Sequence, residues 1–383
     1  MEITSKDHKQ TLGQFFTTNY QYILQGMTIP SNVSTIIEPF TGNGDLLNFI
    51  DRNRYLIECY DIDPKKEYVI CRDTILNPPI YTNKFLLTNP PYLARNKSPN
   101  KLLFDKYDVN DLYKCFIKEI TNNILIGGII IIPLNFWSSI RINDIDIRKR
   151  FLEIYNVLRL NIFEEQVFND TTYTVCSFQF ELRTNNDDNI IKTYIYPSNS
   201  TLDVLLNETN NYMIGGEIYK LPRSGQYKIT RLTTKNKDMP STNIFVKCID
   251  DNENSRIGLT YVSDNNKYID ETPNSTARTF CTLIIEPMIN LNMQKQLINK
   301  VNNYLNEQRC KYHSLFLTNY RESKDIARKR ISFDLIYSLV EYVLDNFDIN
   351  TLNHIEIKPI NTIKDLKNAL MSIPNISTYI KKN

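Results

Sequence analysis

The chain has 383 residues, of which 42% are hydrophobic and 23% charged, and its 45 basic and 43 acidic residues give a formal net charge of +2. This length suggests two or three domains, and the composition excludes a disordered, collagen-like or coiled-coil protein. The near balance of charge excludes a uniformly basic nucleic-acid-binding protein, so an anionic partner has to be bound by local clusters of basic residues.

The first half of the chain alternates strand and helix signals. Buried parallel strands have continuous apolar runs, and strands that alternate with helices at this spacing are typical of a doubly wound α/β sheet. A strand pair is expected at 167–182. The remaining predicted strands are 33–38, 55–60, 85–88 and 129–132, and the predicted helices begin at 46 and span 111–125.

The alternation ends after residue 182. A polar, turn-like segment follows at 183–189, and a basic stretch at 223–237 has no regular pattern. The last third predicts helices at 293–305 and 326–344. We therefore place a boundary near 185–200, between a first domain at 1–185 and a second at 190–383.

Neither a secretion signal nor a membrane span is expected. The first ten residues are polar, and the longest apolar stretch, 124–134, is interrupted by two glycines and is too short to cross a bilayer. The seven cysteines form no CxxC pair and the three histidines lie far apart, so no metal site is predicted. We expect an intracellular protein.

The turn after the first predicted strand has the features of a ligand-binding loop. Glu38-Pro-Phe-Thr-Gly-Asn-Gly44 places two glycines before a helix, where the backbone can approach a ligand and the helix N-terminus favours a carboxylate or phosphate. Asp61 ends the second strand about 20 residues later, where doubly wound folds place an acid against ribose hydroxyls. Taken singly, a glycine turn or a strand-end acid is equally typical of a purely structural element.

A second motif ends the third predicted strand, at Thr88-Asn89-Pro90-Pro91-Tyr92. The two prolines fix the backbone of the turn, so the Asn89 amide oxygen and the Pro90 carbonyl become two fixed acceptors beside the Tyr92 ring. Two acceptors and a ring suit a planar amine, whose lone pair they make available for attack on an activated methyl group. The similar run Asn77-Pro78-Pro79-Ile80 shows that such a turn also arises without this chemistry.

In their order along the chain, these motifs resemble those of the gamma-class amino DNA methyltransferases, the N6-adenine enzymes of type II restriction–modification systems. The resemblance covers residues 10 to about 182, beginning with Gly13-Gln-Phe-Phe-Thr17. It implies a Rossmann-like class I methyltransferase sheet that binds S-adenosylmethionine. The implied cofactor-binding residues are Thr17, Glu38, Phe40, Gly42, Gly44, Asp61, Ile62, Asp73, Asn89 and Phe116.

The resemblance also implies the reaction. A target adenine rotates out of duplex DNA, and Asn89 and Pro90 hold its N6 in line with the methyl group. Tyr92 stacks on the base and Phe168 contacts it, although Tyr173, Phe178 and Phe180 are close in sequence and could serve instead. The chain departs from the family at Asp61, where glutamate is commoner, and at Thr74, where an aromatic residue is often found.

The second half has no counterpart motif, so we expect it to be the target-recognition domain for double-stranded DNA. Basic clusters there can neutralise phosphates or form an ordinary solvated surface. Arg328-Lys-Arg330 is expected to open a helix, where positive charge is unfavourable unless it has a role. The candidate DNA-binding residues are Arg223, Lys228, Arg231, Lys324, Arg328, Lys329 and Arg330. We expect a monomer or weak dimer. A cognate restriction endonuclease that acts separately is a further candidate partner.

Three alternatives stay open. A protein-glutamine N5-methyltransferase also uses Asn-Pro-Pro-Tyr, but that family tends to carry its extra domain before the cofactor loop, whereas here about half of the chain follows the catalytic fold. An RNA adenine N6-methyltransferase would use the same chemistry on a substrate of different shape. A catalytically inactive nucleic-acid-binding module is the alternative of another class, and the presence of Asn89 and Tyr92 argues against it.

Overall fold

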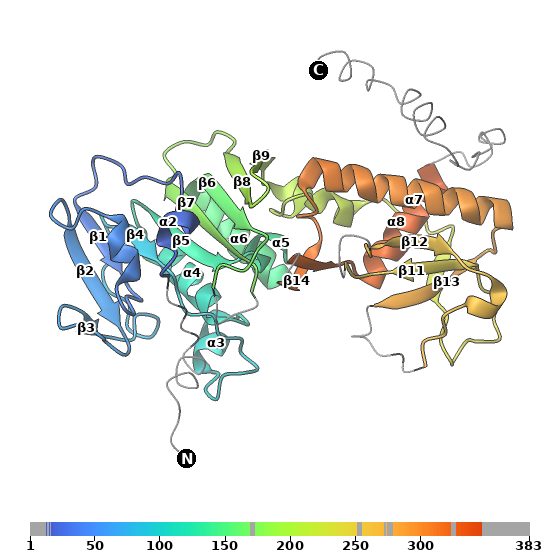
Figure 1. The fold of residues 1–383 in the computed structure, drawn as a ribbon, viewed down its shortest axis with the longest axis horizontal. Helices are drawn as coiled ribbons and strands as arrows, with labels where there is room; N and C mark the ends of the chain where they lie inside the picture. The colour runs from blue at the N-terminus through green and yellow to red at the C-terminus, as the bar shows by residue number, and fades with distance from the viewer. Residues whose placement is uncertain are drawn as a thin grey trace, which may run out of the picture. The chain divides into compact units, whose positions relative to one another are not determined.

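The computed structural model (Figure 1) describes residues 13, 15, 17–168, 173–250, 255–271, 273, 279–322 and 327–346, with the backbone alone described at 319–322, 327 and 328. The first described helix, α2, spans Tyr20–Ile23.

The first half of the chain forms a nine-stranded mixed sheet. Its strands are β1 Thr35–Glu38, β2 Leu56–Asp61, β3 Ile70–Cys71, β4 Phe85–Thr88, β5 Gly127–Pro133, β6 Tyr155–Phe163, β7 Val175–Leu182, β8 Ile190–Tyr196 and β9 Ser200–Leu205. They run in the order β3-β2-β1-β4-β5-β7-β6-β8-β9, and the first five of these are parallel to one another (Figure 1). This arrangement confirms the predicted fold class, a doubly wound α/β sheet.

The central strands form where the sequence predicts them, because their apolar runs are buried on both faces. Every residue of β4 and of β5 is buried, as expected for parallel strands covered by helices on both sides. The short 3-10 helix η1 (Asp45–Phe49) follows β1, and α4 (Leu112–Asn122) lies between β4 and β5 in the chain. The remaining helices of this half are α3 Leu102–Tyr107, α5 Asn135–Ser138 and α6 Ile142–Ile154.

The strand order reverses between β1 and β4, and this point determines where a ligand can bind. From β1 the chain continues outward to β2 and β3, whereas β4 and β5 lie on the other side. Doubly wound sheets leave a crevice at such a reversal, outside the carboxyl ends of the strands. Glu38 ends β1, Asp61 ends β2 and Asn89 follows β4, so all three lie at this edge of the sheet.

The predicted strand pair at 167–182 is wrong. A single strand, β7, occupies its second half and pairs antiparallel with β5 and β6. The partner β6 escaped prediction because it follows α6 directly, with Tyr155 as the C-cap of the helix, and no glycine or proline marks the change.

The sheet also continues beyond the expected end of the first domain. Strand β8 pairs with β6, and β9 with β8, so the sheet runs to Leu205 and past residue 185. The polar segment at 183–189 connects β7 to β8 within this sheet. The division of the chain into a catalytic and a target-recognition domain stays a prediction.

After Leu205, the described residues form two smaller sheets and two long helices. Strands β10 Lys228–Arg231, β11 Ile244–Lys247, β12 Gly258–Tyr261 and β13 Phe280–Glu286 form an antiparallel sheet in the order β10-β13-β11-β12. The remaining elements are the 3-10 helices η2 Glu208–Asn210, η3 Gly216–Lys220 and η4 Asp264–Asn266, the helices α7 Leu291–Tyr312 and α8 Phe333–Asn346, and the strands β14 Thr318–Glu322 and β15 Ala327–Arg330.

The prediction that residues 328–330 open a helix is wrong. They belong to β15, which pairs antiparallel with β14 and forms a further bridge between Arg330 and Ile249. Helix α8 begins only at Phe333, where the Ser332 hydroxyl oxygen accepts the Leu335 N–H at 3.1 Å and caps the helix. The partner strands of 328–330 are distant in sequence, so local periodicity did not reveal them.

Within the described ranges, no helix is long and apolar enough to cross a membrane. No group of three or more His, Cys, Asp and Glu side chains in this part of the chain is arranged to hold a metal ion.

Candidate active site

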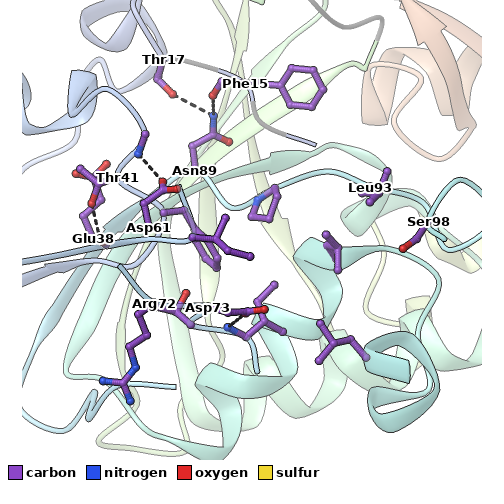
Figure 2. A pocket seen from close by; sticks show the side chains of 18 of the residues that line it. Phe15, Thr17, Glu38, Thr41, Asp61, Arg72, Asp73, Asn89, Leu93 and Ser98 are labelled. Atoms are coloured by element: carbon purple, nitrogen blue, oxygen red, sulfur yellow. Dashed lines mark hydrogen bonds between the residues drawn. The ribbon is translucent and has the colours of Figure 1, made fainter. Parts of the chain in front are cut away.

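A cavity of about 330 Å³ opens at the carboxyl ends of β1, β2 and β4, at the reversal of the strand order (Figure 2). A volume of this size is at the lower end of the range for small-molecule sites. Its wall contains eight of the ten residues that the resemblance assigned to the cofactor: Thr17, Glu38, Phe40, Gly42, Asp61, Ile62, Asp73 and Asn89.

The other two, Gly44 and Phe116, do not line the cavity. Gly44 is the last residue of the loop after β1. Its backbone is left-handed (φ +79°), and it is the N-cap of η1. Phe116 is fully buried on α4, and its ring packs edge-on against Phe40 with a centroid distance of 4.9 Å. Phe40 therefore lines the wall, together with Phe15 and Phe104, and Phe116 packs behind it.

Glu38 places a buried carboxyl group in the wall. Its side chain is 1% exposed, and its Oε2 has no hydrogen-bond partner among the described residues. Burial, together with the nearby Asp61, raises the pKa of Glu38 well above its usual value. A ligand that brings a positive charge next to this group would stabilise the carboxylate.

Asp61 fixes the glycine loop to the end of β2. Its Oδ2 accepts the Gly42 N–H at 2.7 Å, and its Oδ1 accepts the Asp63 N–H at 2.8 Å. Burial raises the pKa of Asp61, against the effect of these two backbone bonds. The sequence suggested a ribose contact for Asp61. In the structure Asp61 also holds the loop after β1 in place through the Gly42 N–H.

The segment after β3 forms another side of the cavity. The Asp73 Oδ1 accepts the N–H groups of Ile75 and Leu76 at 3.1 and 3.0 Å, which closes a tight turn. The Thr74 hydroxyl donates to the Pro39 carbonyl at 2.9 Å and so ties this turn to the loop after β1. At the position where the family often has an aromatic residue, Thr74 thus provides a tether.

The Asn89 amide has a defined orientation at the edge of the cavity. Its Nδ2 donates to the main-chain carbonyl of Phe15 at 2.9 Å and to the Thr17 hydroxyl at 3.0 Å (Figure 2). Its Oδ1 accepts the hydroxyl proton of Tyr92. Pro90 and Tyr92 are buried in the same turn.

The expected open face of Tyr92 is covered by Phe15. The two rings are stacked with a centroid distance of 5.2 Å and an interplanar angle of 29°, and Tyr92 is only 3% exposed. The Phe15 ring also approaches Phe168, with a centroid distance of 6.3 Å. Phe15 was not among the predicted site residues, and its position in a motif assigned to the cofactor gave no sign of this contact.

The structure separates the aromatic residues proposed for contact with the base. Phe178 and Phe180 are fully buried and pack on Phe151 in the core, so they face away from the site. Tyr173 meets the edge of the Tyr92 ring at a centroid distance of 6.2 Å. Phe168 and Tyr173 remain as candidates.

A second, smaller cavity of about 200 Å³ lies beside the same turn. Its wall includes Asp111, whose pKa is raised to about 7 by burial, and the buried ion pair between Lys114 and Asp144, at 2.6 Å. Tyr113 and Tyr173, both in edge contact with Tyr92, also line it. No sequence motif had indicated this cavity.

Lys329, predicted to contact a DNA phosphate, is buried in an ion pair within the protein. Its side chain is 5% exposed, and its Nζ forms a 2.6 Å ion pair with Oε1 of Glu164, immediately after β6. The His313 ring nitrogen Nε2 lies 2.9 Å from the other oxygen of the same carboxylate. The sequence around Lys329 does not distinguish it from the neighbouring basic residues. Its buried state depends on Glu164, which lies 165 residues earlier in the chain.

The other predicted DNA contacts differ in their exposure. Lys228 has a side chain that is 72% exposed, beside Glu286 at 3.3 Å. Arg223 is half-exposed and pairs with Glu341, whereas Arg231 is largely covered, with its guanidinium 4.8 Å from the centroid of the Phe333 ring. Arg330 is partly buried, and the side chains of Lys324 and Arg328 lie outside the described residues.

No protein-family model and no curated protein matches the chain. Solved structures resemble it in part. The methyltransferase subunit of a type I restriction-modification system from Streptococcus thermophilus is 13% identical with a TM-score of 0.35, over 52% of this chain and 48% of that chain. The type IIG restriction endonuclease BpuSI is 13% identical with a TM-score of 0.37, over 61% and 37% of the two chains. DrdV, solved in a complex with DNA, is 12% identical with a TM-score of 0.39, over 63% and 35%.

These matches span about half or less of the lengths of the solved chains.

Proposed function

We propose that the chain is an S-adenosylmethionine-dependent DNA adenine methyltransferase, which transfers a methyl group to N6 of an adenine flipped out of duplex DNA, as part of a restriction–modification system. The observation that carries this proposal is the place of Asn89. Its amide lies at the carboxyl end of β4, between the acids of the larger cavity and the aromatic group of Phe15, Tyr92 and Phe168.

The wall of the larger cavity fits S-adenosylmethionine. The cofactor carries positive charge on its sulfonium and ammonium groups, and the buried Glu38 carboxyl provides the opposite charge. Asp61 is placed at the end of β2 to accept ribose hydroxyls. Phe40 and Ile62 supply apolar surface for a planar adenine ring.

The residues after β4 are suited to a planar amine. When bound, S-adenosylmethionine supplies a methyl group on a sulfonium, and attack by N6 forms the N–C bond as the S–C bond breaks. Asn89 Oδ1 and the Pro90 carbonyl accept hydrogen bonds from the two N6–H groups, which keeps the lone pair directed at the methyl carbon. The methylated nitrogen is then a cation with two hydrogens, and it loses one proton to solvent water to give the neutral product.

Base entry requires the Phe15 ring to leave the face of Tyr92. A flipped adenine that stacks on Tyr92 needs the surface that Phe15 covers, at a centroid distance of 5.2 Å. Base–aromatic stacking contributes about 1–3 kcal/mol, whereas an aromatic pair contributes about 0.5–1.5 kcal/mol. The exchange of Phe15 for the base is therefore close to neutral or favourable.

One assay tests the proposal against its alternatives. The protein is given tritiated S-adenosylmethionine with duplex DNA, structured RNA or a release-factor protein, and the labelled base or residue is identified after digestion. We expect label on N6-methyladenine of DNA. Label on RNA adenine or on glutamine would establish one of the alternative methyltransferases, and no transfer to any substrate would favour the inactive module.

A pair of variants tests the assigned residue in the same assay. Asn89→Ala should bind the cofactor and transfer nothing, because it loses the acceptor and leaves Glu38 and Asp61 in place. The control is Asn306→Ala, on the exposed surface of α7, which should retain full transfer. A folded Asn89→Ala protein with full transfer contradicts the proposal.

A further inference from the structure

We propose that Thr17 is a positioning residue for the reaction. Its hydroxyl anchors the Asn89 amide and at the same time faces the cofactor cavity. This inference rests on the proposed function and changes the role that the resemblance gave Thr17, which was a contact to the cofactor alone.

The segment that carries Thr17 is bound to the Asn-Pro-Pro-Tyr turn by main-chain contacts. The Tyr92 N–H donates to the Gly13 carbonyl at 3.0 Å. Gly13 has a left-handed backbone (φ +68°), and a Cβ atom there would lie 2.7 Å from the Tyr92 carbonyl oxygen. Only glycine allows this approach, so Gly13 is held directly against the turn, four residues before Thr17.

The acceptors around Asn89 determine which way its amide points. The Phe15 carbonyl has no proton, so the amide atom 2.9 Å away has to be the donor Nδ2. Rotating the amide by half a turn would bring Oδ1 against that carbonyl, two acceptors without a proton between them. The Thr17 hydroxyl, 3.0 Å from Nδ2, is the second acceptor. Together they direct Oδ1 away from the segment, toward the side where an amine would bind.

The same hydroxyl faces the cofactor. Thr17 is 3% exposed, and its side chain lines the cavity together with Glu38 and Asp61 (Figure 2). A hydroxyl has one proton and two lone pairs. While one lone pair accepts from Asn89, the proton remains for an acceptor in the cavity, such as a carboxylate of the cofactor. One oxygen thus links cofactor binding to the orientation of Asn89.

Thr17→Val keeps the shape of the side chain and removes both hydrogen bonds. The Asn89 Nδ2 then keeps a single acceptor, the Phe15 carbonyl, and a misdirected Oδ1 lowers the rate of transfer even when every molecule has bound cofactor. We expect kcat at saturating cofactor and DNA to fall about tenfold, the effect of one hydrogen bond to a reacting group. Thr17→Ser restores the hydroxyl and should come within about twofold of the original kcat.

The experiment uses the full chain and measures the cofactor Kd, kcat at saturation and the melting temperature. Thr18→Val is the matched control, because Thr18 is the neighbouring threonine and is exposed; it should match the unmodified protein. If Thr17→Val does not fold, Thr17→Ala removes the hydroxyl without adding a branched apolar side chain and is compared in its place. A raised cofactor Kd with unchanged kcat at saturation would overturn the inference and leave Thr17 as a cofactor ligand.

The experiment distinguishes failure of the positioning role of Thr17 from failure of the proposed function. If the unmodified protein methylates RNA or glutamine instead of DNA, the proposed function is wrong, and the Thr17 variants are compared on the accepted substrate. If it methylates DNA adenine and Thr17→Val has normal kcat, only the positioning role is wrong. If it methylates nothing, both proposals fail.

Discussion

The Tyr92 hydroxyl donates to Asn89 Oδ1, the same acceptor that the proposed reaction assigns to the incoming amine. The hydroxyl has a second acceptor, the Ile131 carbonyl, at 3.0 Å. A tyrosine hydroxyl carries one proton, so it can turn to Ile131 and leave Asn89 Oδ1 for the substrate. Asn89 Oδ1 is thus hydrogen-bonded to Tyr92, and the hydroxyl can release it without losing a partner of its own.

Tyr92→Phe should retain most of the transfer activity. The ring that stacks on the base is kept, and the lost hydroxyl competes with the substrate for Asn89 Oδ1. The variant should be less stable by about 1–3 kcal/mol, because the buried acceptor that receives the hydroxyl proton loses its donor. Steady-state kinetics and denaturant unfolding of the variant measure the two effects. A stable but inactive Tyr92→Phe protein would contradict a role limited to stacking, and Tyr92→Ala, which removes the ring, should be inactive.

Phe15→Ala should ease entry of the target base. The substitution uncovers the face of Tyr92 without touching the Phe15 carbonyl that anchors Asn89. Loss of an aromatic pair worth about 0.5–1.5 kcal/mol should lower the KM for DNA roughly two- to tenfold. Phe15→Tyr keeps a ring in place and serves as the control, with a KM near that of the original protein. A higher KM for Phe15→Ala would show instead that the ring helps to hold the base.

Cofactor binding should release protons through Glu38. In the cofactor-free protein the raised pKa of Glu38 favours the protonated carboxyl. A positive charge of the cofactor beside it lowers that pKa again, so binding releases a proton and weakens as the pH falls. Isothermal titration in two buffers of different ionisation enthalpy, at one pH, counts the protons. Glu38→Gln should abolish the release, and equal heats in both buffers for the unmodified protein would refute the assignment.

The raised pKa of Glu38 also makes the stability of the folded protein depend on pH. A carboxyl whose pKa is raised in the folded state costs stability once it ionises, so its contribution becomes less favourable as the pH rises above the ordinary value of about 4.5. Glu38→Gln removes this cost. The cofactor-free variant should therefore melt at a higher temperature than the unmodified protein at neutral pH, and the difference should shrink toward pH 4.

Lys329→Ala should destabilise the protein without changing the salt dependence of DNA binding. Burial alone would raise the pKa of Glu164, but Lys329 and His313 lower it to about 2. The ion pair thus contributes stability above the unfolded pKa, and this is lost as the pH falls through about 2. Removing Lys329 should cost about 2–4 kcal/mol at neutral pH, as read from denaturant unfolding.

Lys228→Ala provides the contrast. Its side chain is largely exposed, so stability should change by less than about 0.5 kcal/mol. If Lys228 contacts a phosphate, the slope of log affinity against log salt should decrease by about 1. A change of slope in Lys329→Ala, or none in Lys228→Ala, would reverse these assignments.

The sequence predicted well wherever the signal was local. Strands β1, β2, β4 and β5 were predicted because a buried parallel strand is a short apolar run between turn residues, and those features are contiguous in the chain. The cavity followed from the same reasoning: a residue that ends one parallel strand lies near the residues that end its neighbours. Glu38, Asp61 and Asn89 were brought together by topology that the alternation of elements already implied.

Where a residue's partner is distant in sequence, the tertiary structure alone decided. Nothing near Lys329 distinguishes it from a phosphate-binding lysine, and Glu164, 165 residues earlier, makes it a buried ion pair. Likewise Phe15 lies 77 residues before Tyr92, and only folding stacks one ring on the other. Periodicity and spacing report burial and secondary structure, which depend on neighbours along the chain. Which groups finally meet depends on how the elements pack.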